Sequence, residues 1–373
     1  MKAIALAFAI IVSMVTCALA QVTSGDSFDL LGTPSFTSLV GGYQVPPYQV
    51  LPIGDTISIQ SISNPPWNLS GNGHYLDIPT GTTSVPNAGP GVYMTPGNPQ
   101  QGWLLGFWFN PVALTAATDD YFLRFNKAGG QTFGGDTIAL IVTSTGKAKQ
   151  GASLGTTSLG FTANTWVWVE YCIQYGTGHT DGSESLYVGG VNWSTSTGLS
   201  LAVGSFGAAN FNFDNEFGNG HYAFGPWYEK NIGTTACPAG GTHSIMYFKE
   251  YQPAANSAVT WTPSTGSNFS NVNSNPAGAN SNSSATVGNK DIFTTGVPSG
   301  QTGIIGAVAS VNAEKTDGGD RIMLPTWSVS GVATAGSVGN AVPANGAYTT
   351  ILDGAAPSLS ATDLGFGGNG LNN

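Results

Sequence analysis

The chain has 373 residues, of which only 8% are charged, while 41% are apolar and 11% are aromatic. Its Gly 53 and Pro 21 together make up about a fifth of the residues, without a collagen-like period. The aromatic content excludes a disordered polyelectrolyte, and the shortage of charged helix formers excludes a helical bundle. A net charge of -10 argues against nucleic acid or an anionic membrane as partner, because both need a basic surface. A β-rich protein of one or two domains remains.

Residues 1–20 have the pattern of a secretory signal peptide. Lys2 provides a positive start, an apolar stretch follows from Ala3 to Val15, and Ala18-Leu19-Ala20 ends it with small residues. A retained N-terminal hydrophobic segment is the alternative. No later segment is long enough for a bilayer span, so the mature chain is predicted to be secreted, extracellular or on a virion surface, with no membrane span.

Removal of the leader would leave two cysteines, Cys172 and Cys237. In an oxidising compartment these two form a candidate disulfide, and a pair of buried free thiols is the alternative. The histidines are scattered along the chain and show no spacing typical of a zinc site.

The first predicted domain covers residues 21–252. It alternates short apolar runs with clusters of Gly, Asn, Asp, Ser and Thr, which suits antiparallel strands, and no stretch shows a helical period. In Trp166–Ile173 both faces of the predicted strand are substantially apolar, as expected for an inner strand of a sandwich. The predicted strands are Thr56–Ser61, Trp103–Phe109, Tyr121–Asn126, Thr137–Thr143, Trp166–Tyr175, Ser185–Val188 and His243–Tyr251.

Residues 253–288 contain no charged residue and are rich in Asn, Ser and Gly, which predicts a linker or the exposed first strand of a new domain. A second, smaller β domain is predicted over residues 289–373. Its turn signals contain Gly and Asn, which tolerate positive φ. Its predicted strands are Asp291–Phe293, Ile304–Asn312, Arg321–Val329 and Ala347–Leu352.

The first domain resembles the concanavalin A-like jelly rolls of the laminin-G-like and lectin/glucanase kind. The resemblance rests on four segments in order, Trp103–Phe109, Thr165–Tyr171, Gly182–Gly190 and Ile245–Tyr251. It implies an antiparallel jelly-roll sandwich. The fold class is therefore predicted to be all-β, with a jelly roll followed by a smaller β-sandwich domain.

The second domain is similar to a small β domain of tailed-phage virion structural proteins. Its likeness lies in Ala307–Glu314, the Lys315–Gly319 turn, Arg321–Val329, Tyr348–Pro357 and Leu364–Gly367. This resemblance implies a role in assembly, although a secretory leader is unusual for a virion protein.

Catalytic candidates are few. Asp214 and Glu216 would share one face of a strand, as the two carboxylates of a retaining glycosidase do. The segment that starts at His221 resembles the last strands of some polysaccharide lyases, which use a Tyr or His base. A lyase would also need positive charge to bind a uronate, yet the only arginines of the chain are Arg124 and Arg321.

Aromatic side chains next to Asn, Ser and Gly are the main candidates for ligand binding, because flat rings beside amides and hydroxyls suit sugars. No cofactor is predicted. Calcium is the one ion considered, since hard oxygens occur near Gly-rich turns. The ligand candidates are Trp193, Tyr222, Trp227 and Tyr228, with Trp261 as a further aromatic, and the calcium candidates are Asp214, Asn215, Glu216, Asp317 and Asp320.

The sequence thus predicts a structural or binding protein whose jelly roll recognises a glycan or a protein surface. It is expected to be a homo-oligomer or part of a larger assembly. The alternative is a carbohydrate-active enzyme, a glucanase or a lyase, on the same jelly roll.

Overall fold

The computed structural model describes the chain in separate stretches, and every structural statement below concerns these residues. They are 24–26, 35–36, 48–50, 57–68, 72–80, 91–94, 101–114, 119–127, 138–143, 145–150, 156–175, 181–199, 208–215, 220–238, 253–273, 280–295, 309–313, 322–323, 326–329, 332–335, 340–341 and 349–353.

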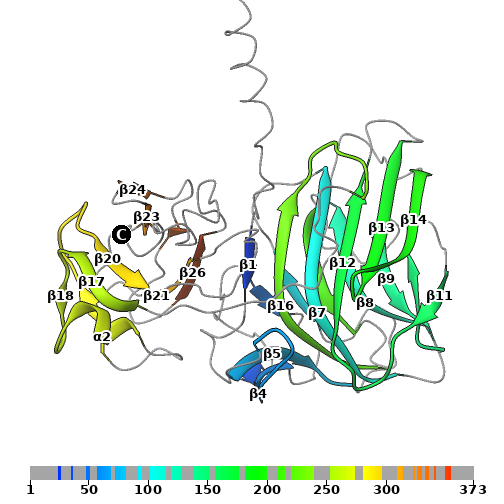
Figure 1. Cartoon of the computed structure of the whole chain (residues 1–373), viewed down its shortest axis with the longest axis horizontal. Coiled ribbons are helices and arrows are strands. Elements are labelled where there is room, and N and C mark those ends of the chain that lie inside the picture. Colours follow the sequence, from blue (N-terminus) through cyan, green and yellow to red (C-terminus); the bar gives the residue numbers. More distant parts are fainter. Residues whose placement is uncertain are drawn as a thin grey trace, which may run out of the picture.

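The described strands form two large antiparallel sheets that pack as a sandwich (Figure 1). The first has nine strands in the order β14-β13-β12-β7-β16-β5-β4-β2, and β1 also pairs with β16. Its strands are β1 (Ser24–Asp26), β2 (Ser35–Phe36), β4 (Ile57–Ser63), β5 (Asn72–Ile78), β7 (Gly102–Ala113), β12 (Val167–Gln174), β13 (Gly182–Val188), β14 (Val191–Leu199) and β16 (His221–Asn231).

The second sheet has seven strands in the order β11-β10-β9-β8-β15-β6-β3. These are β3 (Tyr48–Val50), β6 (Gly91–Met94), β8 (Asp120–Lys127), β9 (Ile138–Val142), β10 (Lys147–Gln150), β11 (Thr156–Gly160) and β15 (Ala208–Asp214). Neighbouring strands in each sheet are often far apart in sequence, so crossover connections join them. The all-β, antiparallel sandwich predicted from the sequence is thereby confirmed.

The main core lies between the two sheets because alternate residues of each strand point inward. On β7 these are Trp103, Leu105, Phe107 and Phe109, and all four are fully buried. Rings from the seven-stranded sheet meet them, and Phe122 stacks on Phe109 with centroids 4.5 Å apart. Aromatic contacts of this kind add to the burial energy.

The face of the nine-stranded sheet turned away from this core, here called the outer face, is also covered. Trp108, Trp168 and Tyr228 point to it and are almost completely buried, as is Trp67 from the segment after β4. Both faces of the sheet therefore carry large apolar side chains. The two-faced apolar pattern of Trp166–Ile173 follows from this.

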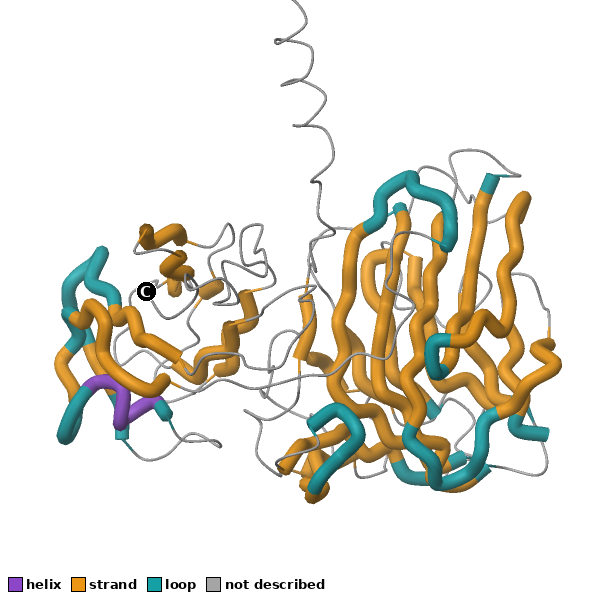
Figure 2. The backbone as a smooth tube through the Cα atoms, in the orientation of Figure 1, coloured by secondary structure: helices purple, strands orange, loops and turns teal. Residues whose placement is uncertain are grey.

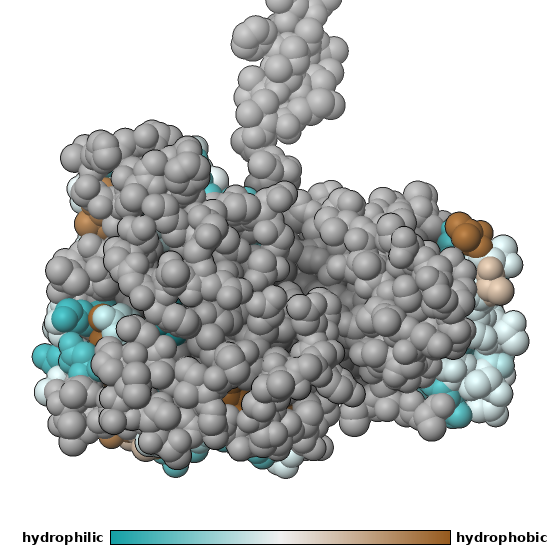
Figure 3. All heavy atoms as spheres, turned by 180° about the vertical axis from the view of Figure 1, so that it is seen from behind, coloured by the Kyte–Doolittle hydropathy of each residue, from teal (hydrophilic) through white to brown (hydrophobic). Residues whose placement is uncertain are grey.

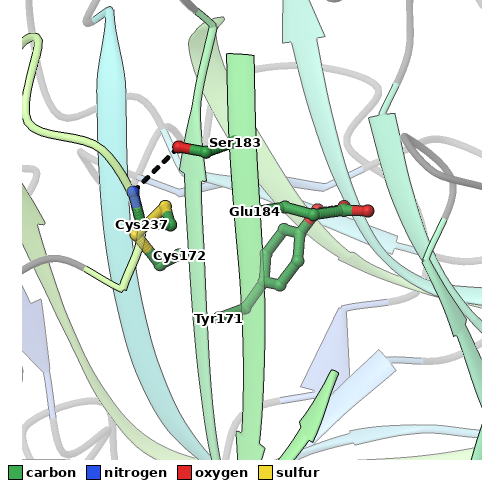
Figure 4. The surroundings of a disulfide bond; sticks show 5 residues. All are labelled: Tyr171, Cys172, Ser183, Glu184 and Cys237. Atoms are coloured by element: carbon green, nitrogen blue, oxygen red, sulfur yellow. Dashed lines mark hydrogen bonds between the residues drawn. A yellow bond between two sulfur atoms is a disulfide. The ribbon is translucent and has the colours of Figure 1, made fainter. Parts of the chain in front are cut away.

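A disulfide joins Cys172 on β12 to Cys237, which follows β16 (Figure 4). Of the two alternatives left by the sequence, the structure has the disulfide. Both cysteines are buried against Leu104 and Ile232. The backbone N–H of Cys237 also donates a hydrogen bond of 2.8 Å to the hydroxyl of Ser183. These contacts hold the segment after β16 against the edge of the outer face.

A smaller group of strands follows, drawn on the left of Figure 1. β17 (Pro253–Val259) pairs with β20 (Asp291–Thr295), and β18 (Thr262–Pro263) pairs with β19 (Asn282–Ser283). The short helix α2 (Asn268–Val272) lies between them and is the one helix among the described residues (Figure 2). The remaining strands are β21 (Ala309–Ala313), β22 (Ile322–Met323), β23 (Thr326–Val329), β24 (Val332–Ala335), β25 (Asn340–Ala341) and β26 (Thr349–Asp353).

Residues 253–288, predicted to be a linker or a first strand, thus contain a strand that pairs with β20. Asp291 anchors this part, because its carboxylate accepts hydrogen bonds from the backbone of Thr260 and Trp261 and from the side chains of Asn268 and Asn282. The surface of this unit, on the right of the view from behind, is mostly pale or teal with a hydrophobic spot at its upper edge (Figure 3). The proposed domain boundaries remain a prediction.

We predict that replacing both Cys172 and Cys237 by Ala lowers the free energy of unfolding by about 4 kcal/mol, because the bond closes a long loop in the unfolded chain. The pair is separated by 65 residues. Urea denaturation of the oxidised protein and of the variant measures this difference. Equal stability would show that the bond does not restrict the unfolded chain as the structure implies.

Candidate functional site

The centre of the outer face is filled by aromatic rings that lie directly on glycines. The ring of Tyr228 stacks on that of Trp168 with centroids 5.9 Å apart, and both cover Gly106. The indole of Trp67 covers Gly73 and Gly225 in the same way. The sheet can accept these rings because those positions have no Cβ.

Three buried carboxylates accept hydrogen bonds from tyrosine hydroxyls. Tyr228 donates to Glu170 at 3.0 Å on the outer face, and Tyr171 donates to Glu184 at 2.8 Å in the main core. Tyr222 donates to Asp120 at 3.1 Å. Burial, and then the charge of the partner carboxylate, raises the pKa of each of these three tyrosines well above its ordinary value. They therefore stay protonated at neutral pH and act as fixed donors.

The end of the outer face over β4, β5 and β16 carries polar groups that reach solvent. Nε2 of His221 lies 2.7 Å from Oδ1 of Asp77, and the two side chains are 29% and 20% exposed. On the neighbouring strand Gln60 is exposed and donates to the hydroxyl of Ser58 at 2.7 Å. Acceptors and donors of several kinds are thus available on one small area.

Two half-buried rings border these polar groups. Tyr75 and Trp166 meet edge to face with centroids 5.4 Å apart, and Trp166 meets Trp67 in the same manner at 4.8 Å. Burial and then the charge of Asp77 raise the pKa of Tyr75, so its hydroxyl remains protonated. We call Gln60, Tyr75, Asp77, Trp166 and His221 the Asp77 patch.

The aromatic residues predicted to bind a ligand lie mostly elsewhere. Tyr222 and Trp227 are 0% exposed in the main core, and Tyr228 is 4% exposed beneath Trp168. A buried ring has no face to offer a sugar, so these three are core residues rather than contacts on a binding surface. Trp193 on β14 is half-buried and packs against Phe161 at 5.0 Å.

Of the acidic and calcium candidates, Asp214 and Asn215 lie in the described part of the chain. Asp214 ends β15 in the seven-stranded sheet, whereas His221 begins β16 in the nine-stranded sheet. Asn215 is buried, and its amide nitrogen donates to the carbonyl oxygens of Pro79 and Gly220, which is a structural role. Glu216, Asp317 and Asp320 lie outside the described residues, so the calcium sites that include them remain predictions.

The described residues hold neither a cluster of metal-ligating side chains nor a helix that could span a membrane. They contain no cluster of three or more His, Cys, Asp or Glu side chains able to hold a metal ion. No helix among them is long and apolar enough to cross a membrane.

Only one residue of the Asp77 patch, His221, is among the site candidates predicted from the sequence. Asp77 and Tyr75 were missed, although the segment Tyr75-Leu76-Asp77-Ile78 alternates and its apolar members Leu76 and Ile78 are buried. That alternation places Tyr75 and Asp77 together on the other face. Their proximity to His221 depends on the pairing of β5 with β16, which the sequence does not reveal.

No family model and no curated protein matches the chain. Among solved structures, domain 4 of the extracellular arabinanase AbnA from Geobacillus stearothermophilus, in complex with arabinotriose, matches 58% of this chain and 95% of its own at 14% identity and a TM-score of 0.34. An endo-β-1,4-glucuronan lyase from the fungus Trichoderma reesei matches 53% of this chain and 95% of its own at 12% identity and a TM-score of 0.37.

The cellulose induced protein Cip1 matches 57% of this chain and 99% of its own, at 13% identity and a TM-score of 0.36. These likenesses are too distant to assign a ligand or an activity to this chain. Its function has to be argued from its own residues.

We predict that the protein loses stability above pH 10. The pKa values of Tyr171, Tyr222 and Tyr228 are raised in the folded state, so the unfolded chain releases protons near pH 10 while the folded chain keeps them. The stabilisation from these tyrosines is complete below pH 10. Above pH 10, each tyrosine lowers the free energy of unfolding by about 1.4 kcal/mol per pH unit.

Urea denaturation at pH 8, 10 and 11 measures this effect, and tyrosinate absorbance reports the ionisation. The three phenols should ionise only as the protein unfolds. Their ionisation in the folded protein near pH 10 would contradict the burial and the pairing described above.

Proposed function

We propose that the protein binds a neutral carbohydrate at the Asp77 patch. The observation that supports this most is the half-exposed pair of rings, Tyr75 and Trp166, beside the Asp77–His221 pair. Rings can pack on the apolar faces of a sugar, while a carboxylate, an imidazole and the Gln60 amide can hydrogen-bond its hydroxyls.

A neutral ligand fits the charge of the chain better than an anionic one. The net charge is -10, and Asp77 places a carboxylate in the patch itself. Arg124 is buried at 2% exposure on β8 of the other sheet, so it cannot neutralise an acidic sugar at this site. A uronate would meet repulsion here, whereas a neutral hexose or pentose would not.

Binding without turnover is favoured by the carboxylates found at the patch. A glycosidase needs two facing carboxylates. Among the described residues, Asp77 is the one carboxylate seen in contact with His221, and their hydrogen bond uses one of its oxygens.

One observation favours an enzyme as second candidate. A carboxylate 2.7 Å from a partly exposed imidazole is the arrangement that fixes the tautomer of a general acid or base. In a lyase or hydrolase of this kind, His221 would transfer the proton and Asp77 would orient its ring. Asp214 and Glu216 remain the other, untested carboxylate candidates.

In the wider proposal, the protein is a secreted or particle-surface component. The jelly roll over residues 21–252 would bind the glycan, and the smaller β domain would serve assembly, as its resemblance to tailed-phage virion domains implies. The chain would act as a homo-oligomer or as part of a larger particle.

The experiment measures binding of cellohexaose and laminarihexaose, which are neutral, and of an alginate hexasaccharide, which is anionic. We predict binding of a neutral oligosaccharide and at least a tenfold weaker affinity for the Tyr75→Ala and Trp166→Ala variants, because each loses a stacking surface. Tyr187→Ala is the matched control. Tyr187 is half-exposed on β13 of the same sheet, four strands from β5.

Three outcomes separate the candidates. Preferred binding of alginate, or equal loss in the Tyr187→Ala control, would contradict the proposed site. Reducing ends or unsaturated uronates that appear with the wild type, and disappear with His221→Ala, would establish the enzyme in place of the binding protein. If these products disappear with Asp214→Asn or Glu216→Gln instead, catalysis lies at those carboxylates.

A further inference from the structure

Asn110 on β7 is a buried polar residue whose side-chain oxygen has no hydrogen-bond partner in the described part of the chain. Its side chain is 5% exposed, and Oδ1 is without a partner among the described residues. A buried polar group left unsatisfied lowers stability, so such groups are uncommon and call for an explanation.

The position of Asn110 connects it to the Asp77 patch. Phe109 points into the main core, so Asn110 lies on the outer face together with Trp108. Strand pairing places Ala223 directly beside Asn110 on one side and Asp77 beside Ala223. Asn110 is therefore two strand spacings, about 10 Å, from Asp77 in the same row across the sheet.

On its other side Asn110 is next to Trp166. Val167 pairs with Phe109, which puts the preceding residue, Trp166, beside Asn110. The Trp166 ring meets that of Tyr75 on β5, and the strands that carry Asn110 and Ala223 lie between β12 and β5. Trp166 precedes β12, so its backbone lies outside the strand ladder. Its ring can turn aside without breaking a strand.

We propose that Asn110 is a ligand-binding residue at the base of the Asp77 patch, and that its carboxamide hydrogen-bonds a hydroxyl of a neutral sugar when the Trp166 ring turns to stack on a face of that sugar. This rests on the proposed function and adds a specificity residue to it. Between Asn110 and Asp77 lies Ala223, whose small side chain does not project between the amide and the carboxylate. One sugar residue can therefore contact both, with hydroxyls toward the amide and the carboxylate.

The test is the Asn110→Leu variant, which keeps the side-chain size and removes the unpaired oxygen. If the oxygen serves a ligand, the variant binds the neutral hexasaccharide preferred by the wild type at least tenfold more weakly, the equivalent of one lost hydrogen bond. Its melting temperature without ligand is equal to that of the wild type or higher, because a buried unsatisfied group has been replaced by an apolar one.

Ser185→Ala is the matched control. Ser185 is 1% exposed on β13 of the same sheet, and its hydroxyl oxygen also lacks a hydrogen-bond partner within the stretches that the structure describes. Its removal should leave affinity unchanged and melting temperature equal or higher. Normal binding by Asn110→Leu, or a clear loss of its stability without ligand, overturns the role of Asn110 while the proposed function stands. No binding by the wild type overturns both.

Discussion

The structure depends on the burial of the nine-stranded sheet on both faces. One face packs on the seven-stranded sheet, and the other packs on its own aromatic side chains, above all Trp67, Trp168 and Tyr228. Such rings fit against the strands only where a residue has no Cβ, at Gly73, Gly106 and Gly225. A few glycines therefore decide where rings lie against the outer face, and Asp77 and His221 reach solvent at one end of it.

Burial on both faces also determines which groups are available for chemistry. Glu170, on the outer face, and Glu184, in the main core, are buried and accept hydrogen bonds from tyrosine hydroxyls, so both contribute to the architecture. Asp77 and His221 stay partly exposed and face the half-buried rings. The proposed binding of a neutral ligand would thus depend on the same packing that stabilises the sheet.

Much of the fold could be predicted from alternation and turn residues, because β7, β8, β12 and β13 have continuous apolar faces. The central strand β16 is absent from the predicted strands, and the structure has an irregular register at Gly225-Pro226 within it. The predicted strand His243–Tyr251 lies outside the described residues. The candidate site was harder to predict from the sequence, because exposed and buried aromatic residues look alike there. Only strand pairing brings Asp77 to His221.

The most direct test of this account is the stability of the Gly106→Ala variant. A methyl group there would overlap the rings of Tyr228 and Trp168. We expect the free energy of unfolding to fall by about 1–3 kcal/mol, as for other overpacked cores, with a change in tryptophan fluorescence. If the outer face were open at this point, alanine would fit a strand better than glycine and would raise stability by up to about 1 kcal/mol. That result would contradict the account.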